Sequence, residues 1–438
     1  MARPDVVIGV ALGVPEDGDF IIGDPARGVI GSTDFTIASG YTTVTGDAYS
    51  VSIRRGRWSR LWDSFDAGSA NVSVWNHDRA YDPSYLLSPF NGFIVPGREI
   101  RVQAGDFAIW TGFVDDIDLA YEVSGQSAAT FKATDALGVL GQQQFDAWTS
   151  TGTSVETKLD DVCNRSEVDW SSALREFDQG VEVLQSDNVS WGSNVLNYAQ
   201  LIARSDLGYL FASADGVLTF RNRNVASSVA SACSFSDAGG TFEAPLYDEG
   251  GDLLLDEFGG ALTGSVDSIG FSDIQATIGS ELLFARVGVD REGGTNQTAT
   301  VADPGAWRDK YGPLRSLSIP QLLLDDDSQS LALAEFILSL YDTPRYRVSE
   351  LTVDLHGLSA TQQSAVLALD IASVVDVTFT PNSVGDPIIQ TLVVQGLAHN
   401  ISVDRHSVTL SLIDAPLPYF RIGDLVYGVI GGEYTIGF

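Results

Sequence analysis

The chain has 438 residues, of which 44% are hydrophobic and 19% charged, and its formal net charge is -33. This length exceeds what one hydrophobic core usually organises, so two to four globular domains are expected and a disordered chain is excluded. The negative charge repels phosphate backbones and anionic lipid, which argues against binding nucleic acid or membranes through charge. No apolar run approaches the ~20 residues that span a bilayer.

Residues 45–145 carry the alternating pattern of half-buried strands. Apolar Tyr49, Val51 and Ile53 alternate with polar residues. Further candidate strands occupy residues 99–104, 107–114 and 130–134. The chain also contains 44 glycines and many β-branched residues, which favour strands and tight turns over long helices. The sequence therefore predicts a mainly β protein with short helices, of the α+β class, in which this region forms a first small β-barrel.

The strongly basic cluster of the chain lies within this first domain. It consists of Arg54, Arg55, Arg57 and Arg60. Arginine forms bidentate pairs with carboxylates, so one interpretation is a docking interface for an acidic neighbour. The other interpretation is an exposed hairpin turn. The sequence does not decide between them.

Residues 146–270 change character and predict an inserted α/β domain. Apolar residues recur at helical spacing in residues 154–163 and 191–205. The second helix is followed by a hairpin over residues 208–220, whose turn contains Asp215-Gly216, a dipeptide that suits a two-residue turn. A helix followed by a hairpin is therefore expected.

Two acidic segments raise the question of calcium. Residues 246–260 repeat acidic pairs every eight residues, but the spacing of an EF-hand loop is absent, so a solvated loop is the preferred interpretation and no metal is assigned. Three aspartates, residues 325–327, precede an apolar run. They predict the negatively charged first turn of a helix over residues 328–342, which Pro344 then ends.

Three segments of the first domain recur, in the same order, near the end of the chain. The matched pairs are residues 96–102 with 370–377, 110–117 with 394–401, and 131–136 with 410–415. Matches in a conserved order suggest a duplication, although short strands also look alike by chance. Residues 271–415 are therefore predicted to form a second β-barrel related to the first.

A glycine motif occurs at both ends of the chain, in predicted arms over residues 1–44 and 416–438. Gly23, Asp24 and Gly28 recur at the same spacing as Gly423, Asp424 and Gly428. No phosphate-binding pattern is completed and no lysine follows, so a phosphate cradle is not predicted. The hypothesis is that both arms dock as interface segments at equivalent strand edges.

The sequence contains no recognisable catalytic or metal-binding pattern. The four histidines, His77, His356, His399 and His406, lack the spacing of a metal pair, and no nucleophile elbow is present. Cys163 and Cys233 form no CxxC pair and are expected to be unpaired, partly buried thiols. Acidic pairs are too abundant in this chain to indicate a glycosidase. No catalytic, cofactor-binding or metal-binding residue is predicted, and the chain is not expected to be an enzyme.

Several segments, taken together, resemble the hub-type minor tail proteins of siphophages, which are related to the baseplate hub proteins of contractile phages. In the first domain they are residues 65–83 (FDAGSANVSVWNHDRAYDP), 88–90 (SPF), 96–98 (PGR), 111–113 (TGF) and 133–137 (ATDAL). Later segments are residues 207–221, 297–317 and 393–412. The resemblance covers most of residues 45–415, and the chain departs from the pattern at both arms.

The resemblance implies a homotrimer in the virion, at the tail tip, made in the cytoplasm of the bacterial host. Two similar barrels per subunit would give a trimer six similar surfaces, enough to adapt a hexameric tail tube or distal tail protein to a three-fold tip. Further implied partners are the tape measure protein and other minor tail or receptor-binding proteins, with DNA only as passing cargo and no membrane. The alternatives are a distal tail ring protein, or a virion-associated glycan-binding or cell-wall hydrolase module.

Overall fold

The structure, a computed structural model, describes residues 3–12, 40–58, 60–123, 125–225, 231–245 and 263–415, and two short strands, β2 (Asp19–Phe20) and β3 (Thr36–Ile37). Strands dominate these residues, and their longest helix, α6 (Asp327–Tyr341), has 15 residues. The predicted mainly β class is therefore confirmed. Among the described residues, no helix is long and apolar enough to cross a membrane.

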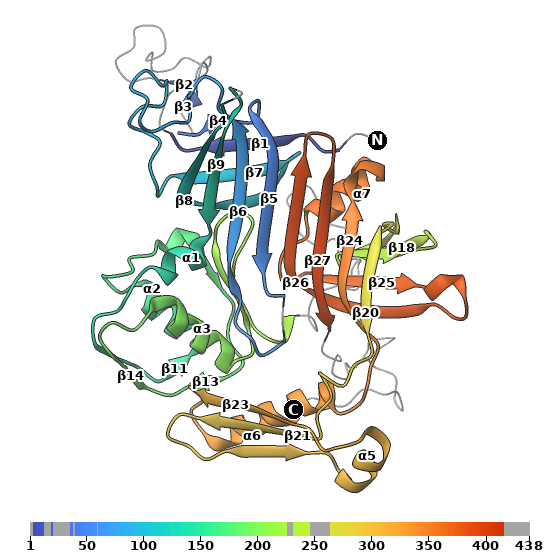
Figure 1. Cartoon of the computed structure of the whole chain (residues 1–438). Helices are drawn as coiled ribbons and strands as arrows, with labels where there is room; N and C mark the ends of the chain where they lie inside the picture. Colours follow the sequence, from blue (N-terminus) through green and yellow to red (C-terminus); the bar gives the residue numbers. More distant parts are fainter. Residues whose placement is uncertain are drawn as a thin grey trace.

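Thirteen strands form one sheet that runs through the molecule (Figure 1). Its order is β20 (Asp273–Thr277), β24 (Arg347–Asp354), β27 (His406–Asp414), β26 (Ile388–Ser402), β5 (Ala48–Gly56), β6 (Asp66–Trp75), β9 (Ser127–Thr134), β8 (Phe107–Tyr121), β7 (Glu99–Ala104), β1 (Val6–Val10) and β4 (Thr42–Thr43). In addition, β25 (Val374–Phe379) pairs with β26 and with β17 (Cys233–Ser236). The alternating sequence pattern explains these strands, since β7 buries Ile100, Val102 and Ala104 and turns the residues between them outward.

Ten of the thirteen strands form two five-stranded units with the same topology, and β1, β4 and β17 extend the sheet beyond them. The first unit has the strand order β5-β6-β9-β8-β7, and the second has the order β20-β24-β27-β26-β25. In both units the chain forms the five strands in the same spatial sequence. It passes through the first and second positions, then the fifth, the fourth and finally the third. A shared order with crossovers at the same places is not expected from unrelated strands that only look alike.

The two units also agree in register. Their fourth strands in chain order, β8 and β26, both have 15 residues, and each forms a β-bulge against the following strand, after Val114 and after Val394. When these bulges are matched, Phe131 corresponds to Leu410, as the sequence comparison predicts. The predicted match of residues 110–117 with 394–401 is wrong by four residues. Apolar alternation repeats every second residue and leaves the register of a long strand open.

The two separate barrels expected from the sequence are not found, because no closed barrel forms among the described residues and the two units share one open sheet. Residues 396–402 of β26 pair with residues 50–56 of β5, and we call this contact the unit junction. Sequence periodicity identifies strands but not their partners. An edge strand leaves backbone N–H and C=O groups unpaired, and β5 and β26 satisfy these groups in each other.

A helical region packs beside the first unit (Figure 1). Its helices are α1 (Ala136–Gly141), α2 (Val155–Cys163) and α3 (Val195–Ser205). The hairpin of β15 (Tyr209–Ala212) and β16 (Leu218–Arg221) follows α3, as predicted, and Gly216 in its turn has φ of +83°. The predicted start of α3 at residue 191 is four residues early, because Asn194 caps the helix by accepting a hydrogen bond from the N–H of Asn197.

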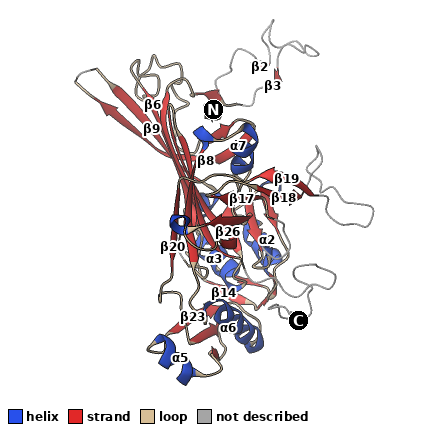
Figure 2. Cartoon of the chain, turned by 90° about the vertical axis from the view of Figure 1, so that its right-hand side faces the viewer, coloured by secondary structure: helices blue, strands red, loops and turns tan. Residues whose placement is uncertain are grey.

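A smaller layer lies below the main sheet in both views (Figure 1 and Figure 2), where α6 packs on a three-stranded sheet and α5 (Pro304–Tyr311) lies at the end of that sheet. The strands of this sheet are β22 (Gln297–Thr300), β21 (Arg286–Arg291) and β23 (Ser316–Leu322). The acidic segment predicted to begin a helix does so, since Asp326 is the N-cap of α6. In the chain, α7 (Ala360–Leu367) follows β24 and precedes β25. In Figure 1 it is at the upper right, away from the small layer.

Candidate assembly site at the unit junction

Arg55 lies inside the unit junction and is 2% exposed. Its Nη1 donates to Oδ1 of Asp370 at 2.7 Å and to the carbonyl oxygen of Ala212 at 3.2 Å. The other carboxylate oxygen of Asp370 accepts from the N–H of Ala214 at 3.0 Å. One ion pair thus connects β5, the second unit and the hairpin of β15 and β16. Removing Asp370 would leave the enclosed charge of Arg55 without its counter-ion, which is strongly destabilising.

Arg57 is also buried, next to the last residues of β5. Its Nε donates to Oε1 of Gln395 at 3.0 Å, and its Nη1 donates to the carbonyl oxygens of Leu61 and Asp63 at 2.5 and 2.6 Å. The guanidinium carbon lies 4.4 Å from the ring centroid of Phe65. Burial lowers the pKa of Arg57 to about 10, so the side chain remains charged at neutral pH. It holds the chain after β5 against the second unit.

The predicted basic interface is therefore split by the fold. Arg55 and Arg57 are enclosed by this chain and belong neither to an exposed turn nor to a surface of the single chain. Arg54 is exposed, with its guanidinium carbon 4.7 Å from the ring centroid of Trp58. Arg60 is exposed and pairs with Glu281 at 2.5 Å. A role in docking stays a prediction for the two exposed arginines.

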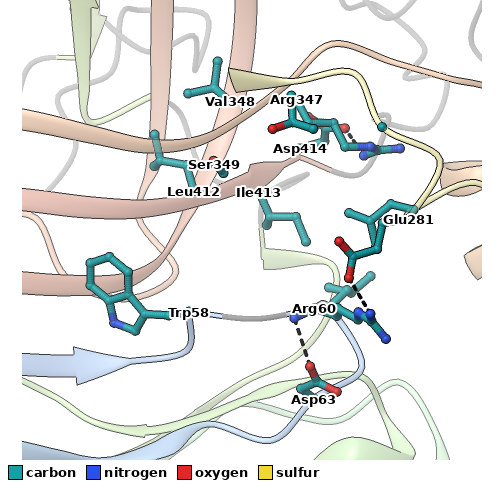
Figure 3. Close-up of a pocket in the computed structure, with 14 residues that line it drawn as sticks. Trp58, Arg60, Asp63, Glu281, Arg347, Val348, Ser349, Leu412, Ile413 and Asp414 are labelled. Carbon is teal, nitrogen blue, oxygen red and sulfur yellow. Dashed lines mark hydrogen bonds and ion pairs between the residues drawn. The ribbon is translucent and has the colours of Figure 1, made fainter. Parts of the chain in front are cut away.

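A cleft of about 380 Å³ opens beside the junction (Figure 3). It is lined by residues of the segment after β5, the segment after β20, and strands β24 and β27. The lining residues labelled in Figure 3 are Trp58, Arg60, Asp63, Glu281, Arg347, Val348, Ser349, Leu412, Ile413 and Asp414. The cleft thus lies where the second unit meets the chain that leaves the first.

The charged side chains of this cleft are paired with one another. Arg347 forms an ion pair with Asp414, and burial raises the pKa of that carboxyl, although the guanidinium opposes the shift. Arg60 pairs with Glu281, and the N–H of Arg60 donates to Oδ2 of Asp63 at 3.1 Å. Two ion pairs therefore frame largely apolar walls.

Two of the four histidines meet although the sequence places them seven residues apart. His399 Nδ1 and His406 Nε2 lie 3.1 Å apart in the hairpin of β26 and β27, and both side chains are buried. Burial lowers the pKa of both, that of His406 to about 4. Sequence reasoning missed this pair because it depends on the antiparallel register, in which His399 is opposite Val408 and His406 opposite Ile401.

The remaining predicted sites lie largely beyond what the structure describes. The acidic repeat at residues 246–260 and the glycine motif residues Gly23, Asp24, Gly28, Gly423, Asp424 and Gly428 are outside the described residues. Within the described residues, no group of three or more histidine, cysteine or acidic side chains is placed to hold a metal ion. Cys163 and Cys233 are unpaired and buried, as expected.

Two strand edges without a partner were not singled out from the sequence. β7 pairs with β8 only up to Phe113, so residues 115–121 of β8 have a partner strand, β9, on one side alone. β20 likewise pairs only with β24. Both statements refer to the strands that the structure describes. The sequence has large apolar residues at every second position of this strand, namely Ile117, Leu119 and Tyr121. This periodicity does not reveal which strand lacks a neighbour.

Comparisons with known proteins identify the fold. The chain is similar to the tail protein from Neisseria meningitidis MC58, with a TM-score of 0.56 and 11% identity over 93% of this chain and 96% of that chain. It is equally similar to the 43 kDa tail protein of prophage MuSo2 from Shewanella oneidensis, with a TM-score of 0.56 and 13% identity over 95% and 99% of the two chains. No family model and no curated protein matches the sequence. The resemblance noted in the sequence is confirmed at the level of the fold.

Proposed function

We propose that this chain, which has the fold of phage tail proteins, is a structural protein of the virion that forms a homotrimeric hub at the tail tip. The observation that carries the proposal is the repeated strand order of the two units within one sheet. A subunit built from two similar units lets three copies present six similar surfaces. Such a hub adapts a hexameric tail tube or distal tail ring to a three-fold tip.

The proposed partners follow from that position. A distal tail protein or the tail tube lies above the hub, and the tape measure protein and other minor tail or receptor-binding proteins contact it from within and below. The net charge of -33 supports a channel through which DNA passes without adhering, because like charges repel at short range. DNA is then cargo in transit and not a bound ligand.

The charges beside the junction support a structural role over an enzymatic one. Two of the three carboxylates that line the cleft, those of Glu281 and Asp414, are paired with arginines, and the third, that of Asp63, accepts from the N–H of Arg60. A glycosidase needs two carboxyl groups whose pKa values are separated and that converge on one open site. In the cleft, two of the carboxyl groups are engaged by arginines and the third by a backbone N–H group.

The number of copies tests the proposal. Light scattering on the purified chain and symmetry analysis of tail-tip images should both give three copies, about 140 kDa for a chain of 46.8 kDa, around a central channel. Six copies would identify a distal tail ring protein instead. A peripheral monomer would favour a glycan-binding or hydrolase module.

A further inference from the structure

We infer that copies of this chain join through their free strand edges, with residues 117–121 of β8 in one copy pairing antiparallel with β20 of the next. This inference rests on the proposed trimer and specifies how the trimer closes. The partner is a second copy of the same chain. The contact between two copies resembles the unit junction, which joins the two units within one chain.

The unit junction supplies the template for this contact. Within the chain, β26 of the second unit pairs with β5 of the first. By their positions in the shared strand order, β8 corresponds to β26 and β20 corresponds to β5. The free edges thus belong to β8 and β20, and their counterparts in the other unit, β26 and β5, are paired with each other. A pairing of β8 with β20 would connect first unit to second unit in the same way.

Matching the two units predicts the register of this pairing. The bulges after Val114 and Val394 place Tyr121 at the position of Ile401. The pairings across β6 and β24 place Ile274 of β20 at the position of Val51 of β5. Ile401 is opposite Val51 in the unit junction. Tyr121 of one copy is therefore expected opposite Ile274 of the next.

The backbone of β8 is oriented for this partner. The N–H of Glu122 donates to the carbonyl oxygen of Gln126 at 2.9 Å, toward β9. Backbone groups alternate in direction along a strand, so those of Tyr121 and Leu119 point away from β9. In β26 the N–H of Ser402 donates in the same way to Arg405 at 2.8 Å, and the alternate residues face β5.

Apolar side chains are more exposed at the free edges than at the equivalent positions of the unit junction. At the unit junction, Ile53 of β5 is 1% exposed and Leu397 of β26 is fully buried. Their counterparts at the free edges, Ala276 and Ile117, are only half-buried although both pack on the core. Tyr121 is 53% exposed. Open apolar strand edges are templates for pairing with another chain, and here the apolar side chains lie on both partners.

The sheet does not close within one chain, because among the described strands β20 pairs only with β24, and residues 115–121 of β8 pair only with β9. Six strands lie between β8 and β20, and neighbouring strands are about 4.8 Å apart, so the two edges are about 34 Å apart along the sheet. The edges differ from each other, which makes the contact heterologous, and a heterologous contact forms a ring when its rotation closes. Three copies in a closed ring leave neither of these edges unpaired.

A disulfide between copies tests the predicted register. Ala120 and Gln275 are exposed and correspond to Asn400 and Ser52, which are opposite each other in the unit junction. Because the backbone of Ala120 points toward β9, the pair is of the type without direct hydrogen bonds, with Cα atoms about 4.5 Å apart, within the range that a disulfide spans. The native cysteines are buried. Oxidation of the Ala120→Cys, Gln275→Cys variant should yield reducible dimers and trimers on a denaturing gel, and nothing larger.

The matched control is the Ala120→Cys, Asp273→Cys variant, whose cysteines lie two residues out of register at about 7–8 Å and should cross-link at least about tenfold less. Light scattering on both variants before oxidation separates the possible failures. A trimer that does not cross-link, or that cross-links equally in the control, overturns the strand pairing and leaves the proposed hub standing. A monomer at all concentrations overturns both.

Discussion

Gly56 and Gly396 face each other at the point where the two units are joined. Gly56 has φ of +87°, and a Cβ atom placed on it would lie 2.2 Å from the carbonyl oxygen of Gln395 and 2.7 Å from the Cα atom of Gly396. These atoms belong to the backbone and cannot rotate away. The close approach of β5 and β26 at this point therefore requires glycine.

We expect Gly56→Ala to lower the free energy of unfolding by about 2 kcal/mol or more, because it combines backbone strain with a steric clash. Urea unfolding followed by circular dichroism measures the change. Gly46→Ala is the control, since no atom lies within 4 Å of its Cβ position, and it should change stability by less than about 0.5 kcal/mol. Equal effects of the two substitutions would contradict a tight junction.

The pair of His399 and His406 makes the same junction sensitive to acid. Burial is the main cause of the lowered pKa values, and the charges of Arg55 and Arg3 lower them further, whereas Asp354 raises that of His406. In the unfolded chain a histidine titrates near 6.5. The unfolded state therefore binds more protons than the folded state between about pH 6.5 and 4. The free energy of unfolding falls as the pH is lowered through this window. Each histidine contributes at most about 1.4 kcal/mol per pH unit to this loss.

Replacing both histidines by leucine should remove this acid sensitivity. The melting temperature of the double variant should fall less between pH 7 and pH 5 than that of the unsubstituted protein, as measured by calorimetry. His77→Asn, at an exposed position, should leave the pH profile unchanged. A double variant with an unaltered profile would show that other groups determine the acid response.

At the scale of elements, α6 begins where its local sequence specifies. Oδ1 of Asp326 accepts hydrogen bonds from the N–H groups of Ser328 and Gln329, at 2.7 and 3.0 Å, and the side chain of Gln329 accepts from the N–H of Asp326 at 3.2 Å. This capping box satisfies backbone donors at the helix start. It explains why three consecutive aspartates predicted the helix correctly within one residue at each end.

Asp326→Ala should destabilise the protein by about 1 kcal/mol, because it removes the N-cap acceptor. Chemical denaturation of the full chain measures this loss. Asp326→Asn keeps an acceptor oxygen and should retain most of the stability, and Asp325→Ala leaves the cap intact and should have little effect. If Asp325→Ala were as damaging as Asp326→Ala, the loss would come from charge and not from capping.

At the scale of the whole molecule, charge opposes the contact between copies. Asp115 and Asp116 are exposed on the free edge of β8, where Asp118 is paired with Lys132, and Asp273 is exposed on β20. In a chain of net charge -33, assembly brings like charges together, and salt screens such repulsion over about 10 Å at 0.1 M. The proposed trimer should therefore be stabilised by salt.

Raising the salt concentration from about 20 mM to about 500 mM should lower the concentration at which trimers dissociate by at least about tenfold. Dilution experiments with light scattering measure this shift. Asp116→Asn should show a smaller dependence on salt than the unsubstituted chain. Weaker association at high salt would mean that ion pairs, such as those proposed for Arg54 and Arg60, dominate the interface.

Features that depend on neighbouring residues could be predicted from the amino-acid sequence. Period-two alternation located strands of the first unit, the Asp215-Gly216 turn located a hairpin, and the matched segments indicated the duplication. These signals are local, because backbone geometry and turn chemistry act over a few residues. They were enough to reach the class of the fold and its resemblance to phage tail proteins.

Which strands meet, and which side chains are enclosed, became apparent in the fold alone. The pairing of β26 with β5 turned two expected barrels into one sheet and buried Arg55 and Arg57. These outcomes depend on contacts between residues hundreds of positions apart. Alternating patterns fit several partners and registers equally well, and the requirement to pair backbone groups and bury apolar side chains together selects one of them.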